Sequence, residues 1–228
     1  IPASFIEENF SAADFLVSCD EAFKLYGEGA VIMPPREQNV DKLGRFTLKM
    51  PASVSGYSGY KFIEELASNA QGRLGQRTAV IRLRLDDGKE VEMDAEFITN
   101  MRTGAAGALG LKYFASQAKS IAILGTGKIS KALALCSAEL GVPRINIYSR
   151  SPENREKFKT ELNHLPMEFI LHDSAPSAVS DAEAILTAVP TPEPVLFFKD
   201  LPANVFISAM GGDSRTSQLD KEIMLGAT

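Results

Sequence analysis

The chain has 228 residues, of which 45% are hydrophobic and 23% are charged, enough for one large domain or two small ones. The formal net charge of -5 argues against nucleic acid as the main partner, because proteins that bind nucleic acid usually present a basic surface. The two cysteines, Cys19 and Cys136, have no paired spacing. We therefore expect neither a disulfide framework nor a metal site, and a reducing, cytoplasmic location fits best.

The sequence carries no sign of a membrane span or of a leader. No apolar run reaches the roughly 18 residues that a membrane-spanning helix needs. The first residues, "IPASFIEENFSAADFL", carry acidic side chains where a signal peptide would be basic. Because the chain begins at Ile1 and not at Met, we expect it to be a processed or excised piece.

The first half of the chain predicts a unit of mixed helix and antiparallel sheet. "AADFLVSCDEAFKLYGEG" has apolar residues at helical spacing, and the helix should stop at Gly27 or Gly29. "RTAVIRLRLDDGKEVEMDAEFIT" has apolar residues on both sides of "DDG", which predicts a hairpin. Residues 102–118 are rich in Ala, Gly and Leu, as expected of a closely packed helix that links this unit to the next.

The second half alternates between predicted strands and helices. The expected strands cover 120–124, 145–149, 167–171, 184–189 and 205–210, and the expected helices cover 128–140, 152–163 and 175–181. Such alternation indicates an α/β fold with a doubly wound parallel sheet of the Rossmann type, preceded by the α+β unit. We place the two domains at 1–115 and 116–228. We expect the second to be incomplete at its C-terminus, because this fold usually has about six strands.

The segment "SIAILGTGKIS" predicts a loop that holds phosphate. An apolar strand runs into Gly125, Thr126 and Gly127, and a helix should start near Lys128. Gly125 would allow the tight turn and Gly127 the close approach of a pyrophosphate, with the helix N-terminus directed at its charge. Such a glycine pattern alone can be a plain turn, but its place between a strand and a helix indicates a dinucleotide-binding site.

The end of the second strand, in "INIYSRSPENREKF", favours NADP(H), while NAD(H) remains possible. Sites for NAD place an acidic residue there, whereas this chain has Ser149, Arg150 and Ser151. An arginine flanked by hydroxyl groups suits a 2'-phosphate, and Arg155 could help one helical turn later. In the alternative interpretation Arg150 is a solvated loop residue, and Ser151 and Pro152 form a helix cap.

Several segments, taken together and in order, carry a family resemblance. These are "MPPRE", "KMPA", "GYKF", "NMRTGAAGALGLKYFA", the glycine loop, "YSRSPEN", "AVPTPEPVL" and "ISAMGGDS...QLD". The chain resembles the ornithine cyclodeaminase/mu-crystallin family, which includes alanine dehydrogenases and ketimine reductases, over nearly its whole length. The resemblance implies an N-terminal domain for substrate binding and dimerisation, a Rossmann domain, and an active site between them. The strand end of "YSRSP" also resembles other NADP domains such as shikimate dehydrogenase, but "MRTGAAG" does not.

The resemblance also implies roles for single residues. Arg36, Lys61 and Arg102 match the basic residues that hold the substrate carboxylate, and Lys61 is also counted among the catalytic residues. Asp213 matches the acid/base, and Thr103 would reach the cofactor phosphates. The residue types agree with this assignment, because three separated cations suit a small carboxylic acid better than a polyanion. Each cation could instead be an ordinary surface charge.

The position of Asp213 in the sequence supports its assignment as the acid/base. It follows the fifth predicted strand, at the sheet edge where open α/β proteins bind ligands, and Gly211 and Gly212 before it would let the backbone approach a nicotinamide ring. The alternative is a plain Asp turn. We expect the two histidines, His164 and His172, to face away from this edge, and we assign neither a catalytic role.

Three functional hypotheses follow. The first is a reductase or dehydrogenase acting on a small α-amino or cyclic α-imino acid by hydride transfer between nicotinamide C4 and Cα. The second is an ornithine cyclodeaminase, a lyase in which the cofactor is recycled within one turnover; the absence of an acid at the strand end counts against it. The third is a non-catalytic protein, similar to mu-crystallin, that binds NADPH and a small ligand. In each case we expect a homodimer with no nucleic-acid or membrane partner.

Overall fold

The computed structural model describes residues 1–66, 77–210 and 217–227. The chain divides into two compact units, which are described separately here. The units comprise Ile1–Ser11 with Ser18–Thr99, and Ala12–Val17 with Asn100–Thr228. Two helices contribute to both units: α2 (Ala12–Gly27) and α3 (Glu96–Phe114). In the described part of the chain, no helix is both long enough and apolar enough to cross a bilayer.

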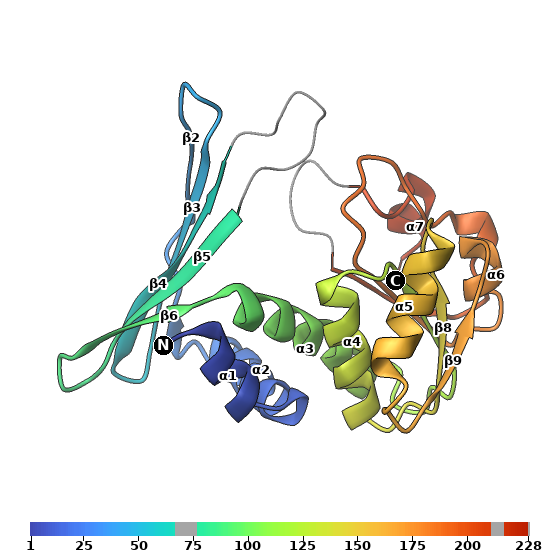
Figure 1. The fold of residues 1–228 in the computed structure, drawn as a ribbon, viewed down its shortest axis with the longest axis horizontal. Coiled ribbons are helices and arrows are strands. Elements are labelled where there is room, and N and C mark those ends of the chain that lie inside the picture. Colours follow the sequence, from blue (N-terminus) through green and yellow to red (C-terminus); the bar gives the residue numbers. More distant parts are fainter. Residues whose placement is uncertain (67–76, 211–216, 228) are drawn as a thin grey trace. The chain divides into compact units, whose positions relative to one another are not determined.

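The first unit is built on an antiparallel sheet (Figure 1). Its strands are β1 (Val31–Ile32), β2 (Glu37–Val40), β3 (Phe46–Val54), β4 (Tyr57–Glu65), β5 (Arg77–Arg84) and β6 (Glu90–Asp94), and a short helix, α1 (Ala3–Asn9), precedes them. The strand order is β1-β3-β4-β5-β6, with β2 also paired to β3. The predicted hairpin around "DDG" is confirmed as β5 and β6, which pair in antiparallel fashion.

The longest hairpin of this unit, β3–β4, is absent from the elements that the sequence predicted. Its strands pair over their full length, from Phe46 opposite Glu65 to the tight turn. The turn consists of Ser55 and Gly56, which both have positive φ, 48° and 84°. Positive φ at both central residues matches the right-handed twist of paired strands, so these two residues fix the register of the hairpin.

The second unit contains the parallel sheet that the sequence predicted. Its strands are β7 (Ile121–Leu124), β8 (Arg144–Tyr148), β9 (Glu168–Leu171), β10 (Ala184–Thr187) and β11 (Phe206–Ala209), in the order β11-β10-β7-β8-β9. Its other helices are α4 (Lys128–Glu139), α5 (Pro152–Leu162), α6 (Ala175–Val179), the 3-10 helix η1 (Phe198–Asp200) and α7 (Lys221–Gly226). The order reverses between β10 and β7, and doubly wound sheets bind ligands at such a point.

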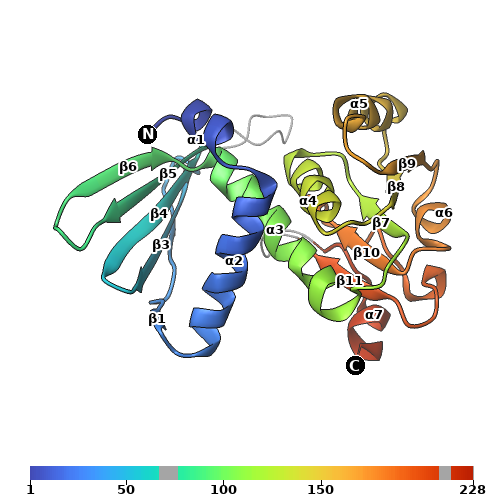
Figure 2. The same cartoon turned by 90° about the horizontal axis from the view of Figure 1, so that it is seen from below.

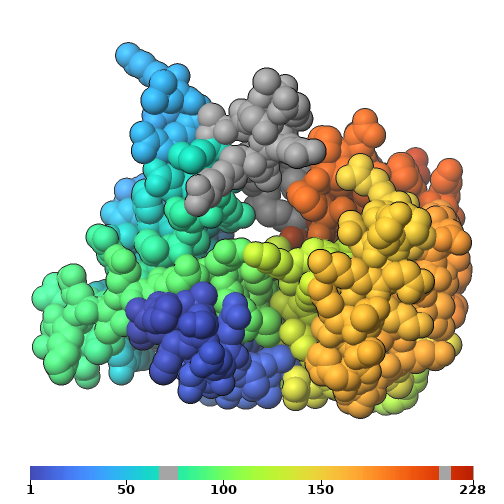
Figure 3. All heavy atoms as spheres, in the orientation of Figure 1, coloured from blue at the N-terminus to red at the C-terminus, as the bar shows by residue number. Residues whose placement is uncertain are grey.

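Two apolar cores sandwich the parallel sheet. On one face, residues of α3, α4 and α5 pack against the strands, with Leu133 and Phe158 fully buried. On the other face, the core is formed with α6 and α7 and includes Val179 and Ile223. Figure 2 shows α4 and α5 on one side of the strands and α6 on the other. In the space-filling view of Figure 3, the atoms of α5 and of the segments after it form one continuous surface.

Helix α3 begins at Glu96, earlier than the composition of the chain predicted. The side chain of Asp94, two residues earlier, bonds to its first amide, because Oδ1 accepts a hydrogen bond from the Glu96 amide at 2.9 Å. Further along, small residues bring α3 against α4: a Cβ added at Gly104 would lie 2.5 Å from the backbone of Ala132. The close packing predicted for this helix is therefore present, and it depends on the absence of a side chain at Gly104.

Candidate functional site

A cavity of ≈ 380 Å³ lies at the carboxyl edge of the parallel sheet, where β7, β8 and β10 end. Three segments line it: the glycine turn after β7, the loop between β8 and α5, and the segment after β10. The lining residues are Leu124, Gly125, Thr126, Gly127, Tyr148, Ser149, Arg150, Ser151, Asn154, Ala188, Val189, Pro190, Thr191 and Val195. The structure thus brings together most of the residues predicted to bind the cofactor.

The two glycines of the turn serve different purposes. Gly125 has φ +109°, and a Cβ there would meet the Oγ of Ser130 at 3.0 Å and the carbonyl oxygen of Ala188 at 3.1 Å. Its amide also donates to the carbonyl of Tyr148 at 2.8 Å. Gly127 has an ordinary extended backbone, with φ -79°, and a Cβ there would meet nothing within 4 Å. The fold therefore needs glycine at 125, whereas glycine at 127 leaves space open.

The start of α4 fits a phosphate group. Gly127 is the N-cap and makes no side-chain cap bond, so the first amides of the helix face the open space of the turn without a capping side chain. Lys128 is the first helical residue and is exposed, but it does not line the cavity. Ser130 is fully buried, and its Oγ has no hydrogen-bond partner among the described residues. The third position of the glycine pattern is therefore filled by a small residue against the turn.

The loop between β8 and α5 is held by its own hydroxyl groups. The Oγ of Ser149 donates to the carbonyl of Ser151 at 3.2 Å. The Oγ of Ser151 accepts from the Asn154 amide at 3.1 Å and lies 2.6 Å from a carboxylate oxygen of Glu153. The helix-cap interpretation of Ser151 is thus confirmed. In the described part of the chain, Arg150 is the one charged residue that lines the cavity, and no side chain pairs with its guanidinium.

Arg155, which the sequence placed beside the 2'-phosphate, is 6% exposed and does not line the cavity. Its Nη1 donates to the carbonyl of Ser149 at 2.6 Å, and its Nη2 donates to Oδ1 of Asp173 at 2.5 Å. The guanidinium is thus bonded to the loop and to the segment after β9.

Gln218 supports the third wall of the cavity, a role that the sequence did not predict. It is 5% exposed, and its Oε1 accepts from the hydroxyl of Thr187 at 2.7 Å and from the amide of Val189 at 3.0 Å. Its backbone carbonyl accepts from the amide of Val195 at 3.0 Å. Val189 and Val195 both line the cavity, so one buried amide side chain and its backbone fix this wall. Gln218 is the first residue of "QLD", which entered the family resemblance, but nothing in these letters indicates this contact.

In the first unit, two of the predicted substrate-binding cations lie on or beside strands that pair with β3. Arg36 directly precedes β2, whose first residue, Glu37, pairs with Lys49 of β3. Met50 in turn pairs with Lys61 on β4, which is half-buried. Strands β2 and β4 both pair with β3, so Arg36 precedes one neighbour of that strand and Lys61 lies in the other.

The remaining predicted residues belong to the second unit. Arg102 is exposed on α3, and its neighbour Thr103 is 7% exposed. Asp213 lies outside the described residues, as do the two glycines before it. Its assignment as the acid/base therefore stays a prediction, as does a joint substrate site formed by residues of both units.

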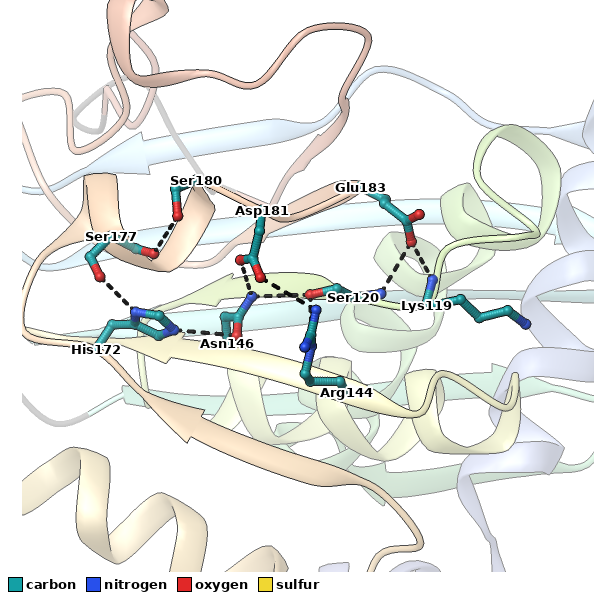
Figure 4. A network of polar contacts seen from close by, with 9 residues as sticks. All are labelled: Lys119, Ser120, Arg144, Asn146, His172, Ser177, Ser180, Asp181 and Glu183. Atoms are coloured by element: carbon teal, nitrogen blue, oxygen red, sulfur yellow. Dashed lines mark hydrogen bonds and ion pairs between the residues drawn. The ribbon is translucent and has the colours of Figure 1, made fainter.

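His172 directly follows β9 at the carboxyl edge, but it does not line the cavity, and its ring contacts residues of α6 and of the interior of β8 instead. Its ring belongs to a network of polar contacts (Figure 4). Nδ1 lies 2.8 Å from the hydroxyl of Ser177, and Nε2 lies 3.2 Å from Oδ1 of the buried Asn146. The Nδ2 of Asn146 donates to Ser120 and to Asp181, both at 3.1 Å. The histidine ring thus belongs to a chain of contacts that joins β7, β8 and α6.

Comparison with known proteins identifies relatives over most of the chain. An alanine dehydrogenase from Archaeoglobus fulgidus is 25% identical over 224 residues, which are 96% of this chain and 69% of that protein. The rat ketimine reductase mu-crystallin is 28% identical over 136 residues, 58% of this chain and 42% of its own length. The chain therefore spans only part of the length of the relatives it matches.

Solved structures share the fold. The Δ(1)-pyrroline-2-carboxylate reductase of Thermococcus litoralis, in complex with NADH and L-proline, superposes with a TM-score of 0.87 at 26% identity, over 97% of this chain and 72% of that one. An archaeal alanine dehydrogenase, a dimer with bound NAD, superposes with a TM-score of 0.88 at 24% identity, over 100% and 72%. The model of the ornithine cyclodeaminase/mu-crystallin family matches residues 3–228. The chain belongs to the ornithine cyclodeaminase/mu-crystallin family, whose related members include amino and imino acid dehydrogenases and reductases.

Proposed function

We propose that the chain is an NADP(H)-dependent oxidoreductase acting on a small α-amino or cyclic α-imino acid, with hydride transfer between nicotinamide C4 and Cα. The observation that carries this proposal is the cavity at the carboxyl edge of the sheet, which the glycine turn and Arg150 line together. A nicotinamide dinucleotide would supply the hydride chemistry, and the protein would supply binding, orientation and electrostatics. The names of the relatives, among them alanine dehydrogenase and Δ(1)-pyrroline-2-carboxylate reductase, support the substrate class.

The charge of the cavity wall supports a preference for NADP(H). Among the described lining residues there is no Asp or Glu that could accept bonds from a ribose 2'-hydroxyl. Arg150 is there, and its planar guanidinium can donate two parallel hydrogen bonds to a phosphate. The hydroxyls of Ser149 and Ser151 are engaged within the loop, so the proposed recognition of the 2'-phosphate depends mainly on Arg150.

The substrate carboxylate would bind to basic side chains. Arg36, which precedes β2, and Lys61 of β4 would share one small carboxylate between their long side chains. Arg102 on α3 would be the third cation. Charged hydrogen bonds of this kind would fix the orientation of Cα before reaction.

The proton would be handled by Asp213. When an amine is oxidised, the carboxylate of Asp213 would take the proton that leaves the substrate nitrogen. When an imine is reduced, Asp213 would return that proton. The support for this step is the place of Asp213 in the sequence, four residues after the end of β11, a strand that pairs in parallel with β10.

One experiment separates this proposal from the cyclodeaminase and from the non-catalytic binder. The full chain is incubated with ornithine, lysine, alanine and cyclic imino acids, each with NADPH, NADP⁺, NADH or NAD⁺, while reduced nicotinamide and ammonia are followed together. We expect net cofactor conversion, faster with the phosphorylated pair. Ammonia release without net conversion would establish the cyclodeaminase instead. Tight NADPH binding with no turnover on any substrate would establish the binding protein.

We also propose that the protein is a homodimer. The support is the archaeal alanine dehydrogenase, which has the same fold and is a dimer. Sedimentation velocity at micromolar concentration should give twice the mass of the chain. A single species with the mass of one chain would contradict this.

A further inference from the structure

We propose that Arg155 is a positioning residue of the cofactor cavity. Its guanidinium fixes the loop between β8 and α5, which NADPH and NADH would both contact, and it does not bind the 2'-phosphate itself. This inference rests on the proposed function, because it requires that the cavity hold a nicotinamide dinucleotide. Arg150 and Arg155, the two arginines of "SRSPENR", therefore have different roles, whereas the sequence alone predicted contact with the 2'-phosphate for both.

The geometry of the guanidinium supports a bracing role. Its two terminal nitrogens bond to two different segments, with Nη1 on the carbonyl of Ser149 and Nη2 on the carboxylate of Asp173, at 2.6 and 2.5 Å. Ser149 directly follows β8, and Asp173 comes just after β9. One side chain from the first turns of α5 therefore connects the ends of two neighbouring strands to the start of the helix.

Burial and charge point away from a direct contact with phosphate. The side chain of Arg155 is 8% exposed, while that of Asp173 is fully exposed, so the buried cation is balanced by a carboxylate on the solvent side. A buried guanidinium is costly unless it is bonded, and releasing this one would leave its charge without a partner. Asn154 lines the cavity and Arg155 does not.

The loop depends on this brace because its other hydrogen bonds within the described part of the chain are local. The hydroxyl of Ser149 bonds to the carbonyl of Ser151, and the hydroxyl of Ser151 caps α5. Both bonds join residues within the same turn. The bond from Arg155 to the Ser149 carbonyl, by contrast, ties the loop to the segment after β9 through Asp173. Its loss would let Ser149, Arg150 and Ser151 move together, and with them one wall of the cavity.

The test compares the affinities of NADPH and NADH for the full chain and four variants, measured by titration well below the melting temperature of each. The variants are Arg155→Met, Arg155→Lys, Arg150→Ala and Lys157→Met. Lys157→Met is the matched control, because it removes an exposed cation of the same helix, whose ammonium pairs with Glu161 at 3.8 Å. Melting curves without cofactor check that each variant is folded.

Bracing and direct binding predict different patterns. A brace shapes a wall that both cofactors share, so Arg155→Met should weaken NADPH and NADH alike, by about threefold to tenfold each, the scale of one hydrogen bond. Arg155→Lys should restore part of this loss for both, because an ammonium can still donate to one acceptor. Arg150→Ala should weaken NADPH by about tenfold or more and NADH by less than about twofold. Lys157→Met should change neither.

Two results would overturn the inference. If Arg155→Met weakened only NADPH, Arg155 would be a 2'-phosphate ligand, and if it changed neither affinity, the brace would have no effect on the cavity. Should Arg155→Met fail to fold, Asp173→Ala is measured with NADH in its place, because alanine removes the acceptor of Nη2 and NADH has no 2'-phosphate that could respond to the lost charge. A brace predicts weaker NADH binding, and unchanged binding contradicts it. If the unmodified chain binds neither cofactor, the proposed function fails.

Discussion

The two glycines of the turn after β7 should respond to substitution in opposite ways. Gly125→Ala places a Cβ at φ +109°, close to Ser130 and Ala188, and should lower the free energy of unfolding by roughly 1 to 3 kcal/mol. Gly127→Val puts a side chain into open space on an ordinary backbone, so the melting temperature should change little. Because that space is where we place the pyrophosphate, NADPH binding should be lost.

Thermal melting and NADPH titration on both variants check this pair. Each variant serves as the control for the other, because Gly125→Ala should lower the stability of the fold, whereas Gly127→Val should fill the open space and leave the stability unchanged. Unchanged NADPH affinity in Gly127→Val would mean that the loop is only a turn.

A substitution of Asp213 distinguishes the hypothesis of an enzyme from that of a binding protein. Asp213→Asn keeps the shape of the side chain but removes the charge that accepts a proton, so turnover should fall by roughly 10² to 10⁴. NADPH affinity should stay within about twofold. Rate, affinity and melting temperature are measured on the same preparation. A rate within a few-fold of normal, with a stability loss of about 1 kcal/mol, would show that Asp213 only stabilises a turn.

At the scale of elements, the contact of α3 with α4 depends on Gly104. Gly104→Val would drive methyl groups into the backbone of Ala132, where even a single Cβ would lie 2.5 Å away. Neither backbone can yield without moving a helix, so we expect a loss of about 1 to 3 kcal/mol or more. Urea unfolding measures it. Gly27→Ala at the end of α2 is the control, because a Cβ there meets nothing within 4 Å; an equal loss in both variants would refute this account.

Helices α4 and α5 are also joined by charge. Glu161 of α5 forms ion pairs with Lys131 of α4 and with Lys157 of its own helix. The hydrogen bond from Lys131 holds the pKa of Glu161 below its ordinary value of 4.5. Because the folded-state pKa is the lower one, the pair stabilises the fold at pH values above 4.5, and this contribution is lost as the pH falls through the lowered pKa.

Lys131→Ala should therefore raise the pKa of Glu161 toward 4.5, which NMR titration of its carboxyl carbon can measure. Lys159→Ala removes an exposed cation of α5 that forms no ion pair with Glu161, and it is the control. An unchanged pKa in Lys131→Ala would show that the pair does not persist in solution.

At the scale of the whole molecule, the alternation of strands and helices made the parallel sheet and its ligand edge predictable, because both follow from short-range patterns. The hairpin of β3 and β4 also had a local signal, since "SG" at 55–56 is a two-residue turn between two runs of strand formers. The early start of α3 likewise had one in Asp94, a residue type that often bonds to the first amides of a helix, as it does to Glu96 here. Both elements therefore follow from residues that are close together in the sequence.

The roles of Arg155 and Gln218 could not be predicted from the local sequence. Both depend on partners distant along the chain: Asp173 for the arginine, and Thr187 and Val189 for the glutamine. From sequence alone, an arginine beside a predicted phosphate site is most simply interpreted as a ligand. Only its burial and its two acceptors point to a different role.

If the cavity holds the cofactor, binding should stabilise the whole chain by mass action. At a free NADPH concentration 100 times the dissociation constant, the free energy of unfolding should rise by about 2.7 kcal/mol, and the melting temperature should rise with it. NADH at the same concentration should give a smaller shift, because it lacks the phosphate for Arg150. Differential scanning fluorimetry measures both, with Arg150→Ala as the control that should bring the two shifts together. Equal shifts in the unmodified protein would contradict the proposed preference.

The bond network around Gln218 bears on how the cavity forms during synthesis. A ribosome makes the chain from its N-terminus, so β7, β8 and β9, with the glycine turn and Arg150, emerge before β10. These three strands are neighbours in the sheet and can pair at once. The third wall is different, because Val189 and Val195 obtain their acceptors only when Gln218 has been added. A nascent chain stalled before that residue should therefore present two finished walls of the cavity and leave the hydroxyl of Thr187 without its acceptor.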